Sequence, residues 1–200
     1  MNKSFFGSGL GLLVIALVLL AILGIGYTSI GNKLVTLDEN TTAAWAQVET
    51  VLQRRYDLIP NLVSTVKGYA AHEKEILEEV TRLRSQWGAA KSVDDKVKKA
   101  GELESVLSRL LVVAEKYPEL KADQNFRDLQ YELSGTENRI AVERGRYNDS
   151  IRTYNTAVRQ FPGSLVASRK GLVPKTAYFE AAEPAKEAPK VDFTEKAKAE

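Results

Sequence analysis

The chain has 200 residues, with 28 Lys and Arg against 26 Asp and Glu, one His and no Cys. This length suits one domain or two small ones. The near balance of charge lacks the basic excess of a nucleic-acid-binding protein, so we expect no nucleic acid among its partners. Because Cys is absent, disulfides, thiolate metal ligands and Cys nucleophiles are excluded. We expect no cofactor and no ordinary metal-dependent or nucleophile-dependent enzyme.

A long uncharged segment near the N-terminus predicts a membrane-spanning helix. No charged side chain lies between Lys3 and Lys33, and residues 10–27 hold twelve Leu, Ile or Val residues. At about −0.4 kcal/mol each near the bilayer centre, these residues favour insertion by about 5 kcal/mol. A cleaved signal peptide is the alternative, but its apolar region is shorter, about 7–15 residues. We predict a short tail over 1–9 and a transmembrane anchor over 10–30, with residues 10–27 in contact with the lipid bilayer.

The charges beside this anchor favour neither orientation strongly. Lys3 and the α-amine flank one end, whereas Lys33, Asp38 and Glu39 follow the other, so the count of flanking positive charges is nearly tied. The short N-terminal tail is typical of a signal anchor that exports the chain behind it. We expect a single-pass protein of the bacterial inner membrane, with its bulk on the extracytoplasmic side.

Beyond the anchor, apolar residues at a seven-residue repeat predict a long amphipathic helix. The repeat begins at Trp45 and keeps both of its apolar frames as far as Trp87, where Gly88 gives a stop signal. Pro60 lies inside the repeat without changing its phase, which predicts a kink and not a break. Such a proline frees the backbone carbonyl of Tyr56, four residues back.

Two further long helices and a short fourth one follow. Spacings of three and four residues run over 93–117 and again from Phe126 to Phe161, with Asp123 as a candidate N-cap for the later helix. Residues 165–170 add a short helix. No segment shows the alternating pattern of a strand.

These elements predict an all-α fold: an N-terminal transmembrane helix followed by an elongated antiparallel bundle of three long helices plus a short fourth helix. No helix can bury so long an apolar stripe alone, so the helices must pack together. We place the helical-bundle domain at 31–171. An extended, mobile C-terminal tail is predicted at 172–200, since the segment from Glu183 is rich in Ala, Lys, Glu and Pro.

Two charged residues, Arg55 and Glu73, stand at apolar positions of the first predicted helix. They are 18 residues apart, about 27 Å along a helix, so each needs a partner from another helix. Glu132, Glu137 or Glu143 could serve Arg55. We interpret these residues as members of interhelical ion pairs that fix the register of the bundle.

The pair Arg54–Arg55 also suits an anionic lipid headgroup. On a straight helix, however, Arg55 lies about 40 Å beyond Tyr27. The surface potential of a bilayer decays within about 8–10 Å. Direct lipid contact would need a helix that folds back onto the membrane.

The single histidine gives no sign of a metal site. Bundle di-metal centres need two Glu-x-x-His motifs, and no Glu lies three residues before His72. His72 could instead join Asp57 and Asn61 at a cleft beside the Pro60 kink, which would give a ligand-binding or hydrolytic protein. No phosphate-loop or nucleophile-elbow motif accompanies that alternative.

A Tyr-Asn pair occurs twice at a seven-residue spacing, as Tyr147-Asn148 and Tyr154-Asn155. We expect both rings to pack in the apolar seam, with each hydroxyl and amide hydrogen-bonded to a neighbouring helix. The alternative is a polar stripe that docks a partner protein.

The sequence resembles the LemA family in three segments after the anchor. They are 43–77, which contains RRYDLIPNLV and KGYAAHE; 115–162, which contains ENRI, RYN, YN and FP in that order; and 177–193, AYFEAAEPAKEAPKVDF. Just after the anchor the sequence reads YTSIGNKLV, where many relatives have a Tyr-Asn-x-Leu-Val run.

The resemblance implies a single-pass bacterial membrane protein with a long helical-bundle domain and no established enzymatic activity. Some relatives have been linked to building or remodelling membranes. The segment from Arg54 to Val63 and the pair His72-Glu73 occupy the family's signature positions, to which the family assigns no chemical role.

These observations favour a membrane-anchored helical scaffold that is not an enzyme. It would bind to itself as a homo-oligomer, or to other membrane proteins. A ligand-binding or hydrolytic protein with a cleft at Pro60 is one alternative, and a lipid-binding protein that remodels membranes is another.

Overall fold

The computed structural model describes residues 3–180, with side chains from residue 10 onward. The helices in this range are α1 (Lys3–Tyr69), α2 (Lys74–Ala89), α3 (Val93–Ala114), α4 (Pro118–Ala122), α5 (Gln124–Arg159) and α6 (Gly163–Lys170). Turns and one extended segment account for the rest, and no strand occurs within residues 3–180. The predicted all-α class is confirmed.

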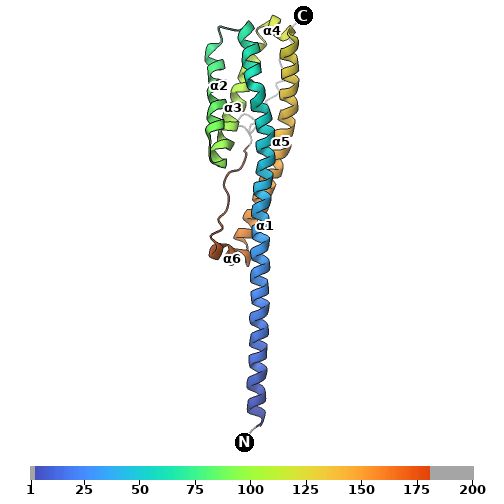
Figure 1. Ribbon diagram of the computed structural model, residues 1–200, viewed down its shortest axis with the longest axis vertical. Helices are drawn as coiled ribbons and strands as arrows, with labels where there is room; N and C mark the ends of the chain where they lie inside the picture. Colours follow the sequence, from blue (N-terminus) through green and yellow to red (C-terminus); the bar gives the residue numbers. More distant parts are fainter. Residues whose placement is uncertain (1–2, 181–200) are drawn as a thin grey trace, which may run out of the picture.

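α1 determines the shape of the molecule. Its 67 residues correspond to about 100 Å at the 1.5 Å rise of an α-helix. In Figure 1 the first part of α1 stands alone, while its second part packs in a bundle with α2, α3 and α5, and α4 lies at the far end. α2 and α5 run antiparallel to α1. The predicted elongated antiparallel bundle behind an apolar N-terminal helix is confirmed.

The main core of the bundle consists largely of the apolar residues that the sequence repeat predicts. These buried residues include Trp45, Val48, Leu52, Ile59, Leu62 and Val66 on α1; Val80, Leu83 and Trp87 on α2; Leu103, Leu107 and Leu110 on α3; and Phe126, Leu133, Ile140, Tyr147 and Ile151 on α5. The predicted seam residues Tyr69 and Phe161 are exposed instead, at 42% and 79%.

The first helix of the bundle, predicted to reach Trp87, ends early because the chain reverses after Tyr69. In the turn that follows, the Glu73 N–H donates a hydrogen bond to the Ala70 carbonyl (3.1 Å). The apolar repeat keeps its phase through the turn because α1 and α2 both bury their apolar faces in the same core. Glu73, the charged residue at an apolar position of the repeat, lies in this turn. The bundle therefore has four long helices and not three.

Pro60 lies inside α1 without ending it, as predicted. Its missing N–H leaves the Tyr56 carbonyl without its usual helical partner. Arg84 of α2 supplies a replacement, because its Nε donates to the Tyr56 carbonyl at 3.0 Å. The proline thus creates an acceptor that ties α1 to α2.

α6 closes the bundle at the end that faces the apolar part of α1 (Figure 1). Val166 and Ala167 of α6 pack with Leu34 of α1 and with the end of α5 in a second, smaller core. The short helix predicted at 165–170 is present within α6.

Gly171 ends α6 in a left-handed conformation, with φ of 68°, and residues 172–180 then run extended back along the bundle. We name residues 172–180 the strap. The sequence predicts a mobile tail from residue 172, whereas the strap contacts α1 and α5 as described below. Residues 1–2 and 181–200, which hold the rest of the predicted tail, lie outside the described residues.

Candidate functional site

The charged residues at the RRYDLIPNLV signature join α1 to α5. Arg55 Nη1 lies 2.5 Å from Glu137 Oε2, and Arg54 Nη2 lies 3.0 Å from Glu132 Oε2. The predicted interhelical ion pair of Arg55 is confirmed, with Glu137 as its partner. Arg55 is 9% exposed, so the loss of Glu137 alone would leave a buried charge unpaired.

A similar pair connects α5 to α3, where Arg144 Nη2 lies 2.8 Å from Glu104 Oε2. The two arginines approach the buried ring of Tyr56, whose pKa is raised by burial and only partly lowered again by the nearby Arg55 and Arg144. These partly buried charges sit among apolar core residues. Their geometry supports a register-fixing role.

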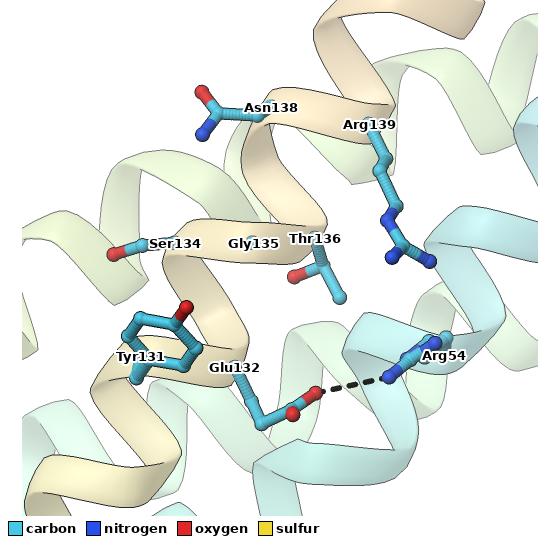
Figure 2. A pocket seen from close by; sticks show the side chains of 8 residues that line it. All are labelled: Arg54, Tyr131, Glu132, Ser134, Gly135, Thr136, Asn138 and Arg139. Atoms are coloured by element: carbon cyan, nitrogen blue, oxygen red, sulfur yellow. Dashed lines mark hydrogen bonds and ion pairs between the residues drawn. The ribbon is translucent and has the colours of Figure 1, made fainter.

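The exposed Arg54 borders a pocket of about 300 Å³ on the α1–α5 face, which is lined largely by polar side chains. Figure 2 shows Arg54 on α1 opposite α5, with the Glu132 side chain turned toward it. Arg139 lies seven residues further along α5. The residues that line this pocket are Arg54, Tyr131, Glu132, Ser134, Gly135, Thr136, Asn138 and Arg139. Neither a histidine nor a second carboxylate lines it, so its side chains suit polar contact more than acid–base chemistry.

The predicted cleft beside Pro60 does not bring its three candidate residues together. Asn61 lines an open hollow of about 410 Å³ with residues of α5, but neither Asp57 nor His72 lines it. Asp57 is exposed and accepts a hydrogen bond from Gln53 (2.8 Å) on the same helix. His72 is exposed in the turn between α1 and α2. The three candidate residues therefore do not line this hollow together.

Glu73, next to this histidine, has a tyrosine hydroxyl as its partner within the described residues and not a cation, so the predicted interhelical ion pair is wrong for Glu73. The Tyr117 hydroxyl donates to Glu73 Oε1 at 3.0 Å, a contact that raises the pKa of Tyr117. Close by, the Tyr69 hydroxyl donates to Asp123 Oδ2 at 3.0 Å. Asp123 also accepts the Phe126 N–H (2.9 Å), which confirms the predicted N-cap and is the main reason why the pKa of Asp123 is lowered.

The two Tyr-Asn pairs of α5 bind the strap. Asn155 accepts the Lys175 N–H and donates to the Lys175 carbonyl, both at 2.8 Å. Asn148 does the same for Phe179, at 3.0 Å and 2.8 Å. Each amide thus satisfies both backbone groups of one strap residue. The expectation that these amides bond a neighbouring helix is wrong, because their partner is an extended segment.

The two asparagines are spaced somewhat more closely than the two strap residues that they bind. Seven residues along a helix span about 10.5 Å, and the four steps from Lys175 to Phe179 span about 13 Å of extended chain.

Aromatic rings hold the far end of the strap. The Phe179 ring lies 6.2 Å from Trp45 of α1 and 5.9 Å from Tyr147 of α5, measured between centroids. Burial raises the pKa of Tyr147 to about 12. Tyr147 therefore packs in the seam, as predicted. The role of Phe179 was not apparent from the sequence.

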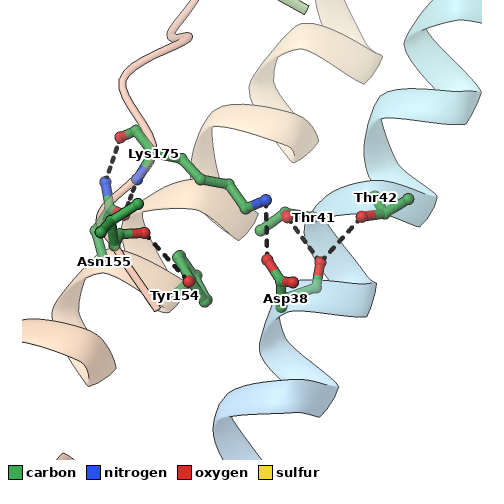
Figure 3. Close-up of polar contacts among 7 residues, drawn as sticks. Asp38, Thr41, Thr42, Tyr154, Asn155 and Lys175 are labelled. Carbon is green, nitrogen blue, oxygen red and sulfur yellow. Dashed lines mark hydrogen bonds and ion pairs between the residues drawn. The ribbon is translucent and has the colours of Figure 1, made fainter. Parts of the chain in front are cut away.

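A second group of contacts holds the strap near α6 (Figure 3). Lys175 Nζ lies 2.8 Å from Asp38 Oδ1 of α1 and 5.4 Å from the ring of Tyr154. The Tyr154 hydroxyl donates to the Val173 carbonyl at 3.2 Å. The strap thus connects α1 to α5 across the surface of the bundle.

The apolar part of α1 has no protein partner among the described residues. Its most apolar window has a mean hydropathy of 2.8 and is entirely unburied, and by length and composition it could cross a membrane. No group of three or more His, Asp or Glu side chains suited to a metal ion occurs within the described part of the chain.

Comparison with known proteins places this architecture in a family. The model of the LemA family matches residues 44–193. The chain belongs to the LemA family. The match covers α1 from residue 44 onward, α2, α3, α5 and also the strap, so the Asn148 and Asn155 contacts fall inside the family's region.

Individual relatives agree with this assignment. The chain is 27% identical over 175 residues to magnetosome protein MamQ 1 of Paramagnetospirillum magneticum, covering 74% of this chain and 64% of the relative. It is 28% identical over 167 residues to MamQ of Magnetospirillum gryphiswaldense, covering 70% and 61%. Protein LemA of Metamycoplasma hominis is 26% identical over 161 residues, covering 78% and 72%. The chain spans less than two thirds of these MamQ relatives.

Proposed function

We propose that this LemA-family protein is a single-pass membrane scaffold that works by association with itself or with other membrane proteins, and not by catalysis. The observation that carries the proposal is the continuity of α1. One continuous helix, Lys3–Tyr69, contains both the apolar segment and the first helical part of the bundle. Without a flexible linker, the bundle is held at a fixed height and direction from the membrane.

The surface of the bundle supports association more than chemistry. The Arg55–Glu137 ion pair and the strap contacts lie between elements of the chain, and the pocket at Arg54 is lined largely by polar side chains. The names of the relatives, magnetosome protein MamQ and protein LemA, are not those of enzymes. A role in membrane organisation is in keeping with the magnetosome relatives.

We further propose that the protein resides in the bacterial inner membrane with its bundle outside the cytoplasm. The positive charge of Lys3 before the apolar segment supports this orientation, while Lys33 beyond the segment counts against it. The chain has no Cys, so a single Tyr131→Cys variant reports sidedness, because Tyr131 is 80% exposed on α5. Labelling by a membrane-impermeant maleimide in intact spheroplasts is expected. Labelling only after lysis would show that the bundle faces the cytoplasm.

The scaffold itself is tested by the mass of the full-length protein in mild detergent. Light scattering, corrected for bound detergent, is measured over a range of protein concentrations. A discrete assembly larger than one chain of 22.1 kDa is expected. A monomer at every concentration would refute self-association, and partners would then be sought among co-purifying membrane proteins.

A further inference from the structure

The end of the bundle nearest the apolar segment is formed by the turn after α5 and by α6 (Figure 1). α6 contacts α1 close to where the apolar segment stops. The Lys170 side chain crosses α1 at Gly31, where an added Cβ would lie 2.9 Å from Lys170 Cε. Gly31 is four residues beyond Tyr27, or about 6 Å along the helix.

That distance places α6 at the level of lipid headgroups. The hydrocarbon core of a bilayer is about 30 Å thick and the whole bilayer about 40–45 Å, which leaves about 5–7 Å of headgroup on each side. If α1 crosses the bilayer with Tyr27 at the interface, where tyrosines are enriched, the C-terminal end of α6 meets the headgroups.

The exposed side chains at this end have the chemistry of a membrane interface. Phe161, in the turn, is 79% exposed and Leu165, on α6, is 61% exposed. Phe161 continues the apolar repeat of α5, yet it projects from the bundle instead of entering the core. Aromatic and aliphatic side chains in this setting insert at the boundary between headgroups and acyl chains.

Positively charged side chains occur at the same end of the bundle as these two apolar residues. The cations are Lys33 on α1, Arg159 at the end of α5, and Arg169 and Lys170 in the last turn of α6. All four are exposed, and none forms an ion pair within the described part of the chain. Such cations favour the negative surface of a membrane that contains anionic lipids.

Acidic side chains begin further from the membrane. The first on α1 are Asp38 and Glu39, and Asp38 is paired with Lys175 of the strap. The signature arginines Arg54 and Arg55 are about 40 Å from Tyr27 along α1, beyond the reach of the surface potential.

We propose that the turn after α5 and the exposed face of α6 form a second membrane contact, a foot that rests on anionic lipid headgroups. The foot consists of Phe161, Leu165, Arg169 and Lys170. It would stop the bundle from swinging about the spanning helix and would make its orientation depend on lipid charge. This inference rests on the proposed function only in requiring that α1 crosses the bilayer.

The test uses the full-length protein in lipid nanodiscs with one spin-labelled cysteine at a time. Leu165→Cys reports the foot and Leu17→Cys the spanning segment. Val112→Cys on α3 is the matched control, because Val112 is 67% exposed. Collision rates with oxygen, which concentrates in lipid, and with a water-soluble nickel chelate give the depth of each label. Nanodiscs of phosphatidylcholine are compared with discs that contain phosphatidylglycerol.

We expect the ratio of oxygen to nickel collisions at Leu165→Cys to be several-fold higher than at Val112→Cys, and to rise further with phosphatidylglycerol. Equal ratios at the two positions in both lipids would overturn the foot while leaving the scaffold intact. A water-exposed label at Leu17→Cys would instead overturn the spanning helix on which both proposals depend.

A charge variant tests the lipid preference separately. In the Leu165→Cys background, Arg169→Gln with Lys170→Gln is expected to abolish the increase caused by phosphatidylglycerol. If the increase persists unchanged, anionic headgroups are not what the foot recognises.

Discussion

Replacing Asn155 by Ala should release the strap and leave the bundle folded. The Asn155 side chain makes three hydrogen bonds, two with the backbone of Lys175 and one with the Tyr178 hydroxyl at 3.1 Å. At about 1 kcal/mol for each neutral hydrogen bond, docking of the strap loses about 2–3 kcal/mol. Once the strap detaches, water can hydrate its peptide groups. The lost free energy therefore weakens docking of the strap and not the folding of the bundle.

Trypsin cleavage after Lys175 measures this release. Where opening is fast relative to cleavage, the cleavage rate follows the population of the open strap. A loss of about 2 kcal/mol raises that population roughly 30-fold, since about 1.4 kcal/mol corresponds to a factor of ten. Mass spectrometry identifies the peptide that ends at Lys175.

Two further variants make the prediction graded. Asn148→Ala removes two hydrogen bonds with the backbone of Phe179 and should have a smaller effect than Asn155→Ala. Asn138→Ala is the matched control, since Asn138 lies exposed on the same helix at the polar pocket. Cleavage of Asn155→Ala at the rate of the control would refute the argument.

Three other predictions concern the bundle. Ile59→Asp should unfold it by burying an unpaired charge. Arg55→Leu should be neutral or stabilising, because the Glu137 side chain is 37% exposed and can turn its carboxylate into water once the arginine is gone. Thermal melts decide, and equal melting temperatures for the two variants would contradict the core assignment. Gly163→Ala should destabilise the bundle, since the added Cβ would lie 2.2 Å from a backbone oxygen of α5. Gly135→Ala, with open space around the added Cβ, should stabilise the bundle by up to about 1 kcal/mol. The two variants should therefore shift the melting temperature in opposite directions. Because the pKa of Tyr147 is raised to about 12, its contribution to stability is complete below about pH 10 and is lost as the pH rises toward 12. Tyr147→Phe should make alkaline denaturation shallower, and an unchanged profile would contradict this.

The sequence predicted the core well because burial follows local periodicity. Residues such as Trp45, Leu52 and Ile59 are spaced to share one face of a helix, and they share it whatever that face meets. Arg55 was interpreted correctly for the related reason that a charge in an apolar seam needs a partner.

What the sequence did not reveal depends on long-range geometry. The reversal after Tyr69 was hidden because the repeat keeps its phase in α2. The partner of Asn155 was missed because nothing near it in the sequence identifies Lys175. Phe161 fits the repeat of α5, but its helix has already ended at Arg159, so it has no core to enter.

The continuity of α1 from membrane to bundle is tested most directly by a distance between two spin labels on it. The absence of native Cys allows a double variant, Leu20→Cys with Thr50→Cys, at two exposed positions. In nanodiscs, thirty residues of unbroken helix predict a narrow distribution centred at about 45 Å. A broad distribution, or one centred well below that distance, would show that the spanning segment and the bundle are separate bodies and would contradict the rigid scaffold.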